Sequence, residues 1–191
     1  MFLCNIVRQL ANEPRDFALH AEVLPTSYTK SGTRIRALMH EIQPDYVVAL
    51  GVANGRKHIN LERFAVNIND ASIADTDDDL RQGVPIVPNA PPAYRASLPL
   101  EALYTCLNKA NIPVRYSNHA GAYVCNHLMY TMLHNIAQAK KRGVRAGFIH
   151  VPMMREAQGE KGADVGLPLT QMIDAVRLCL QALAQTQPDR G

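Results

Sequence analysis

Cys125 is the residue whose position in the sequence best suits nucleophilic chemistry. It lies in the segment Ala120–His127, where an extended stretch gives way to one apolar stripe at helical spacing: Val124, Leu128, Met132 and Ile136. A cysteine attacks a carbonyl as its thiolate, and the partial positive charge at a helix N-terminus favours that form. We therefore expect Cys125 near a helix start as a candidate nucleophile. A thiol simply buried in a strand-to-helix turn is the alternative.

The other three cysteines are expected to be ordinary packing residues. Cys106 and Cys179 fall within helical patterns of leucines, where a cysteine usually acts as a small apolar side chain, and Cys4 is interpreted in the same way. The four cysteines have neither metal-type spacing nor the density of a disulfide framework. We expect four free thiols and no zinc site.

His150 is the preferred candidate for a general base, although spacing alone does not select it from the seven histidines. It ends the apolar run Ala146–Val151, and side chains at the carboxyl ends of buried strands form the sites of α/β sheets. His127 is two positions from Cys125 and would point elsewhere on the helix. Glu62 could orient an imidazole as a third group, or could be a solvated acid.

The segment Gly51–Gly55 could be taken for a phosphate loop, because glycines let backbone amides approach an anion. The pattern favours this only weakly. It lacks the third glycine of a dinucleotide motif and has no Gly-Lys-Ser/Thr ending, and the residues that follow look extended.

These candidates must be positioned by alternating helices and strands. Apolar spacing predicts helices over 2–12, 29–42, 99–110, about 124–142 and 169–185. Strands are predicted at 19–24, 46–50, 64–68, 114–117 and 146–151, and the proline-rich, acidic stretch 70–98 is predicted to be a long surface loop. Alternation of this kind indicates a mostly parallel sheet covered on both faces, in a single domain over residues 1–191.

Composition narrows the class of protein. The chain has 191 residues, 47% of them hydrophobic, and a net charge of +3, which suits a globular domain. The basic run Lys140, Lys141, Arg142 and Arg145 follows a predicted helix and is interpreted as cations at a helix end, so no nucleic acid partner is expected. No apolar run is long enough to span a bilayer and no signal peptide is recognised, which predicts a cytoplasmic protein without a membrane partner.

Three separate segments resemble, in order and spacing, the glutamate, cysteine and histidine motifs of the pyroglutamyl peptidase I (pyrrolidone-carboxylate peptidase) family. They are Ile59-x-x-Glu62-Arg63-x-Ala65-x-Asn67, Ala120-Gly121-x-Tyr123-Val124-Cys125-Asn126-His127 and Phe148-Ile149-His150-Val151-Pro152. The resemblance extends over almost the whole chain. It implies a three-layer α/β/α fold with a mixed, mostly parallel central sheet.

The resemblance also implies an activity. Cys125, His150 and Glu62 would be nucleophile, general base and orienting acid of a thiol peptidase that removes N-terminal pyroglutamate from peptides, with no metal or cofactor. The positions that match the family's pocket for the lactam ring are Thr26, Ile73, Tyr123 and Val124.

The chain also departs from the family pattern. The family usually opens with a strand and an aromatic Gly-Phe-x-Pro-Phe-Gly loop, whereas Met1 here matches the helix that follows them. Val52 replaces a glutamine that could recognise substrate, and Asn60 and His119 also differ. A non-catalytic paralogue that binds through the same fold, or a cysteine amidase for another small lactam or amide, therefore remain alternatives. Apolar surface left by the missing strand favours a homo-oligomer.

Overall fold

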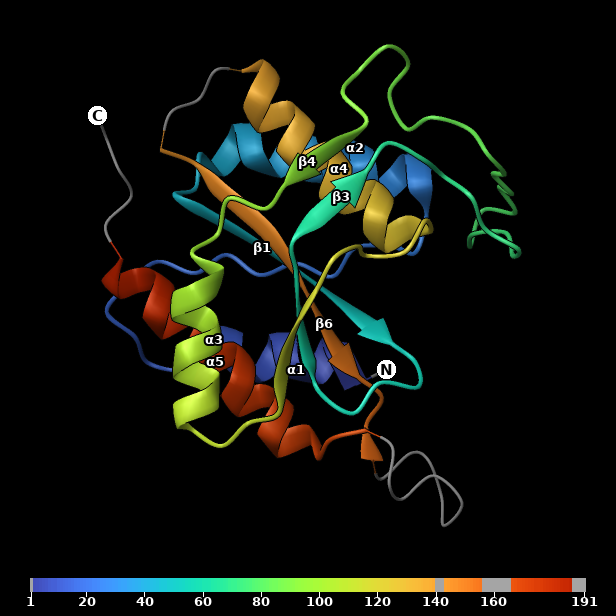
Figure 1. The fold of residues 1–191 in the computed structure, drawn as a ribbon. Coiled ribbons are helices and arrows are strands. Elements are labelled where there is room, and N and C mark those ends of the chain that lie inside the picture. Colours follow the sequence, from blue (N-terminus) through green and yellow to red (C-terminus); the bar gives the residue numbers. More distant parts are fainter. Residues whose placement is uncertain (1, 140–142, 156–165, 187–191) are drawn as a thin grey trace.

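The centre of the molecule is a four-stranded sheet in the order β1-β6-β2-β5 (Figure 1). The computed structural model describes residues 2–139, 143–155 and 166–186. The strands are β1 (Tyr46–Ala53), β2 (Ile59–Glu62), β5 (Val114–Ser117) and β6 (Arg145–Pro152). β1 pairs with β6 and β2 with β5 in parallel, whereas β2 and β6 are antiparallel. The predicted mixed, mostly parallel sheet is thus confirmed.

Helices cover both faces of the sheet. In Figure 1, α1 (Phe2–Ala11), α3 (Leu100–Lys109) and α5 (Leu169–Gln185) lie on one side, with α2 (Tyr28–Ile42) and α4 (Val124–Gln138) on the other. Each side has its own apolar core, one built with α1, α3 and α5 and the other with α2 and α4. This confirms the expected three-layer α/β/α architecture.

β6 occupies an inner position because it is apolar on both faces. Ile149 and Val151 belong to the core beneath α1, α3 and α5, whereas Ala146 and Phe148 belong to the core beneath α2 and α4. His150 therefore emerges on the α2/α4 side, two residues after Phe148. The side on which α4 packs is also the side to which His150 points.

A small antiparallel ribbon of β3 (Phe64–Val66) and β4 (Ala93–Arg95) lies beside α4. Asn126, in the first turn of α4, binds this ribbon. Its Oδ1 accepts from the Val66 N–H at 2.9 Å, and its Nδ2 donates to the carbonyls of Val66 at 2.9 Å and Ile68 at 3.0 Å. These three bonds fix the start of α4 relative to the chain that leaves β2.

Most predicted elements are confirmed, and two predictions are wrong. The strand over 114–117 and the helix over 169–185 have the predicted bounds, and the other helices and confirmed strands differ by a few residues within the described chain. Residues 19–24 form no strand, because no neighbouring strand is there to pair with them. The stretch 70–98 is not all loop, since it contains β4. Lys140, Lys141 and Arg142 lie outside the described residues.

No helix in the described ranges is both long and apolar enough to cross a membrane. The prediction of one domain over residues 1–191 stays a prediction.

Candidate active site

Cys125 is the second residue of α4, as its sequence context predicted. Tyr123 caps the helix with extended backbone, and the first bond of the helical ladder runs from the His127 N–H to the Tyr123 carbonyl at 3.0 Å. The N–H groups of Val124, Cys125 and Asn126 therefore precede that ladder and point out of the helix end. Such groups suit a developing negative charge close to the Cys125 sulfur.

The Cys125 sulfur occupies space that is open because Gly51 on β1 has no side chain. A Cβ at Gly51 would lie 2.9 Å from Cys125 Sγ and 2.8 Å from the Phe148 ring, so a side chain here requires one of them to move. Gly51 is also the register partner of His150 on β6. Because partners on parallel strands share a face of the sheet, Cys125 Sγ lies over the face to which His150 points.

Glu62 and His150 form a buried hydrogen-bonded pair. His150 Nδ1 lies 2.8 Å from Glu62 Oε1, and the two residues are 4% and 0% exposed. The antiparallel pairing of β2 with β6 sets Glu62 opposite Phe148, two positions from His150, a diagonal that long side chains can cross. An Nδ1–H donated to the carboxylate leaves Nε2 of His150 free to accept a proton.

Arg56 is a site residue that sequence reasoning missed. It lies in the connection between β1 and β2, and its Nη1 is 3.2 Å from Glu62 Oε1, the same oxygen that faces His150. The side chain is partly exposed, and its positive charge offsets the buried charge of Glu62. No sequence periodicity predicts this pairing, because Arg56 meets Glu62 through the connection between the two strands.

The thiol of Cys125 is held in its protonated form in the resting protein. Burial raises its pKa to about 11, and the negative charge of Glu62 contributes in the same direction. The prediction of a thiolate rested on the helix N-terminus, whereas burial and the charge of Glu62 both favour the protonated thiol. Attack by this sulfur consequently requires a base that removes the proton during the reaction, and the free Nε2 of His150 is on the same face.

Three of the predicted pocket residues are brought together by one loop. The Tyr123 hydroxyl donates to the Ala74 carbonyl at 2.9 Å, and the Thr76 N–H and hydroxyl both donate to the Thr26 carbonyl at 3.0 Å. Ile73, next to Ala74, is 63% exposed, which is unusual for so apolar a side chain. Tyr123 and Thr26 thus both bind the loop segment 73–76, to which Ile73 belongs.

The two remaining pocket predictions differ in outcome. Val124, the first residue of α4, is buried beside Cys125. Val52 is paired with Val151, whose side chain belongs to the core under α1, α3 and α5. Since paired residues share a face, the structure does not bring the Val52 side chain to Cys125.

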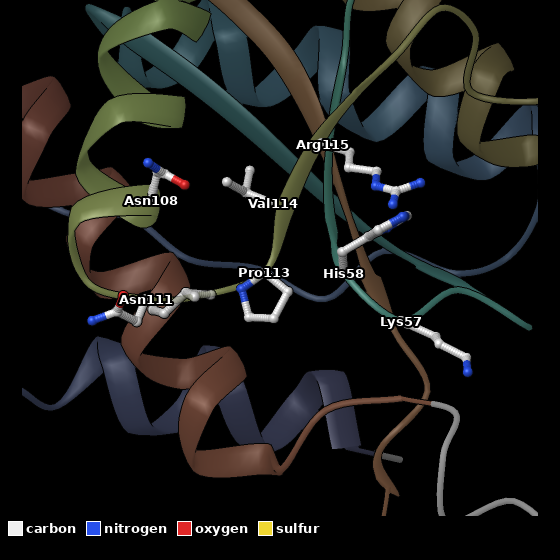
Figure 2. Close-up of a pocket in the computed structure, with 8 residues that line it drawn as sticks. Lys57, His58, Asn108, Asn111, Pro113, Val114 and Arg115 are labelled. Carbon is white, nitrogen blue, oxygen red and sulfur yellow. The ribbon is translucent and has the colours of Figure 1, made fainter.

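A separate surface pocket of about 500 Å³ does not include the three candidate catalytic residues. It is lined by Lys57, His58, Asn108, Asn111, Ile112, Pro113, Val114 and Arg115. Figure 2 shows its basic side chains on one side of Pro113 and Val114 and its two asparagines on the other, without convergence on one point. Within the described parts of the chain, no group of three or more His, Cys, Asp or Glu side chains could hold a metal ion.

The sequence matches a family model described as pyroglutamyl peptidase over residues 4–186. Among curated relatives, the chain is 37% identical to pyrrolidone-carboxylate peptidase 1 of Photorhabdus laumondii, over 96% of this chain and 86% of the relative. It is also 37% identical to pyrrolidone-carboxylate peptidase 1 of Caldanaerobacter subterraneus, over 85% of this chain and 79% of the relative.

Solved structures give the same result. Pyroglutamyl peptidase I of Bacillus amyloliquefaciens superposes with a TM-score of 0.89 at 32% identity, covering 97% of this chain and 89% of that chain. A variant of the pyrrolidone carboxyl peptidase of Pyrococcus furiosus superposes with a TM-score of 0.87 at 32% identity, covering 95% and 89%.

Proposed function

The chain belongs to the pyroglutamyl peptidase family, and we propose that it is a cysteine exopeptidase that removes N-terminal pyroglutamate from small peptides. The names of its relatives and structural neighbours support this activity. The observation that carries the proposal is the buried 2.8 Å contact between Glu62 and His150, on the sheet face where Cys125 Sγ lies against Gly51.

Cys125 is the nucleophile in this proposal and His150 is the base. His150 Nε2 takes the thiol proton as Sγ forms a bond to the pyroglutamyl carbonyl carbon. The N–H groups at the start of α4 stabilise the oxyanion. His150 then gives its proton to the departing amine, the peptide leaves, and a thioester remains on Cys125.

Water completes the reaction. His150 accepts a proton from a water molecule that attacks the thioester, and the Cys125 sulfur recovers its proton when pyroglutamate departs. Glu62 holds His150 in the tautomer with Nδ1 protonated and stabilises its positive charge during both half-reactions. Arg56 limits the energetic cost of keeping the Glu62 carboxylate buried.

The lactam ring is proposed to bind against Thr26, Ile73, Tyr123 and Val124. The ring is small, neutral and largely apolar, so the exposed Ile73, next in the chain to the Ala74 carbonyl that the Tyr123 hydroxyl binds, offers surface that a substrate would cover. Val52 has no assigned role in this pocket because its side chain belongs to the opposite face of the sheet.

Hydrolysis of a fluorogenic pyroglutamyl amide tests the proposal. We expect cleavage by the wild-type protein, selective over alanyl and prolyl amides, that is lost in Cys125→Ser and retained in Cys4→Ser. Cleavage that survives Cys125→Ser would remove Cys125 from the mechanism. A folded protein without any cleavage would instead favour a binding role, and cleavage of other small amides only would favour an amidase.

Assembly and location belong to the same proposal. A homo-oligomer is supported by β1, which lies at a sheet edge and carries the uncharged, partly exposed sequence Tyr46–Ala53. A cytoplasmic location is also proposed, and it is supported by the four free thiols, which suit a reducing compartment.

A further inference from the structure

Cys106 and Cys179 form a thiol pair between two helices, on the face of the sheet opposite Cys125. Cys106 lies on α3 and is partly exposed, whereas Cys179 lies on α5 and is 1% exposed. The Cys106 sulfur is 3.2 Å from the Leu103 carbonyl oxygen and 3.9 Å from that of Leu178, the residue before Cys179. The Cys106 sulfur thus contacts the backbone of α5 directly beside the second thiol.

The ionisation of each thiol also depends on the other. The Cys179 thiol can donate a hydrogen bond to the Cys106 thiolate, and this is the main reason that the pKa of Cys106 is lowered to about 7. The N–H groups of Leu107 and Cys106 act in the same direction, whereas burial opposes them. The same bond, together with burial, raises the pKa of Cys179 well above its ordinary value. One thiol of the pair is therefore partly exposed and has a lowered pKa, whereas its neighbour is buried and has a raised pKa.

We propose that Cys106 and Cys179 are a redox-modification site, at which a peroxide converts the two thiols into a disulfide that joins α3 to α5. The Cys106 thiolate attacks one peroxide oxygen, the O–O bond breaks and Cys106 becomes a sulfenic acid. The other oxygen leaves as hydroxide and becomes water by taking up the proton that the Cys106 thiol released on ionisation. The Cys179 sulfur then attacks the sulfur of the sulfenic acid. An S–S bond forms, the S–O bond breaks, and the oxygen leaves as a second water with the Cys179 proton.

An accessible thiol that ionises readily, next to a second thiol, is the arrangement that favours this chemistry over further oxidation. Neither cysteine has a role in the proposed peptidase reaction, because the central sheet separates them from Cys125. The proposal therefore stands or fails independently of the peptidase activity. The link would also restrict the unfolded chain between α3 and α5, so the oxidised protein should melt about 5 °C higher.

Peptide mapping of the whole chain tests this proposal. The reduced protein is treated with one equivalent of hydrogen peroxide, blocked with N-ethylmaleimide and digested with trypsin without reductant. We expect the peptide of residues 96–109, which holds Cys106, to be linked to the peptide of residues 178–190, which holds Cys179. Oxidation of Cys106 beyond sulfenic acid with Cys179 still free would overturn the proposal, as would a link formed only between two chains.

Variants identify the order of the two steps. In Cys179→Ser, whose hydroxyl can still donate to the Cys106 thiolate but cannot form a disulfide, Cys106 should stop at a sulfenic acid that dimedone labels. In Cys106→Ser, Cys179 should remain a free thiol after the same treatment. Cys4→Ser is the matched control and should form the link as the wild type does. Equal oxidation of Cys179 with and without the Cys106 thiol would contradict the assigned order.

Discussion

At the scale of single residues, the proposed chemistry depends on two contacts on the same face of the sheet: Cys125 Sγ against Gly51, and Glu62 with His150. Because Gly51 has no side chain, the Cys125 sulfur can lie close to the backbone of the sheet. Glu62 binds Nδ1 of His150, which leaves Nε2 to accept a proton. The raised pKa of Cys125 shows that this environment favours a neutral thiol. In the proposed mechanism, removal of the Cys125 proton is consequently a step of each turnover.

Gly51→Ala is expected to reduce kcat/KM by about 100-fold, because the added methyl group competes with Cys125 Sγ and the Phe148 ring for the same space. It should also destabilise the protein by about 1–3 kcal/mol, as overpacking usually does. Hydrolysis rates and urea unfolding measure the two effects. The Cys125→Ala background removes one of the two obstructing groups, so the destabilisation should be smaller there. Full activity in Gly51→Ala would refute the proposed position of the sulfur.

Glu62→Gln should lower kcat/KM by about 100-fold or more, since the amide no longer favours the required tautomer and charge of His150. The same change removes a negative charge that raises the pKa of Cys125, so that pKa should fall. Ultraviolet thiolate absorbance during a pH titration, referenced to Cys125→Ser, measures the shift. Glu101→Gln, at an exposed acid on α3, is the control and should change neither quantity. An unchanged Cys125 titration would show that Glu62 has no influence on the thiol.

At the scale of elements, the sequence predicts helices and strands that follow from local apolar spacing. It does not predict structure that depends on contacts with segments distant in the sequence. The helix over 169–185 follows from its apolar spacing, and the motif segments lead to Glu62, Cys125 and His150. Residues 19–24 are apolar enough for a strand but have no ladder to join. β4 has only three residues within a proline-rich stretch. Arg56 was missed because it meets Glu62 through the turn that connects β1 and β2, a contact that no sequence period encodes.

His127 links α2 to α4 and should make stability depend on pH. Its Nδ1 is 3.0 Å from Asn69 Oδ1, its ring contacts Tyr28, and burial followed by the charges of Arg81 and Arg36 lowers its pKa to about 4. The folded protein thus favours neutral His127, and an unfolded chain binds its proton at a higher pH. The stabilisation is complete above pH 6.5 and should decline by about 2–3 kcal/mol as the pH falls to about 4.

Urea unfolding at a series of pH values measures this decline. His127→Gln should remove most of the pH dependence over that range, whereas His40→Gln, at an exposed position on α2, should leave it in place. If the two variants show the same slope as the wild type, the acid sensitivity arises elsewhere in the chain.

At the scale of the whole molecule, β1 is an edge strand of the described sheet, and its outer edge is the surface on which we expect a second copy of the chain to associate. Its eight residues include no charge and no proline, the features that usually prevent edge strands from associating. We expect the protein to be oligomeric in light scattering at micromolar concentration. Val52→Lys, at a partly exposed position of β1 that belongs to neither apolar core, should shift the protein towards smaller species. Val23→Lys makes the same change at an exposed residue outside the sheet and should not; equal effects would mean that charge alone determines the assembly.

The inner position of β6 has a consequence for synthesis on the ribosome. Among the described residues β6 is the last strand in the sequence, yet it lies between β1 and β2, which are synthesised far earlier. A nascent chain that ends before residue 145 therefore has β1 without its neighbour and Glu62 without His150. Contacts between such distant segments form slowly and leave apolar strands uncovered until they do. The candidate active site is thus completed only late in translation. The final quarter of the chain must first leave the ribosome so that β6 can insert between β1 and β2.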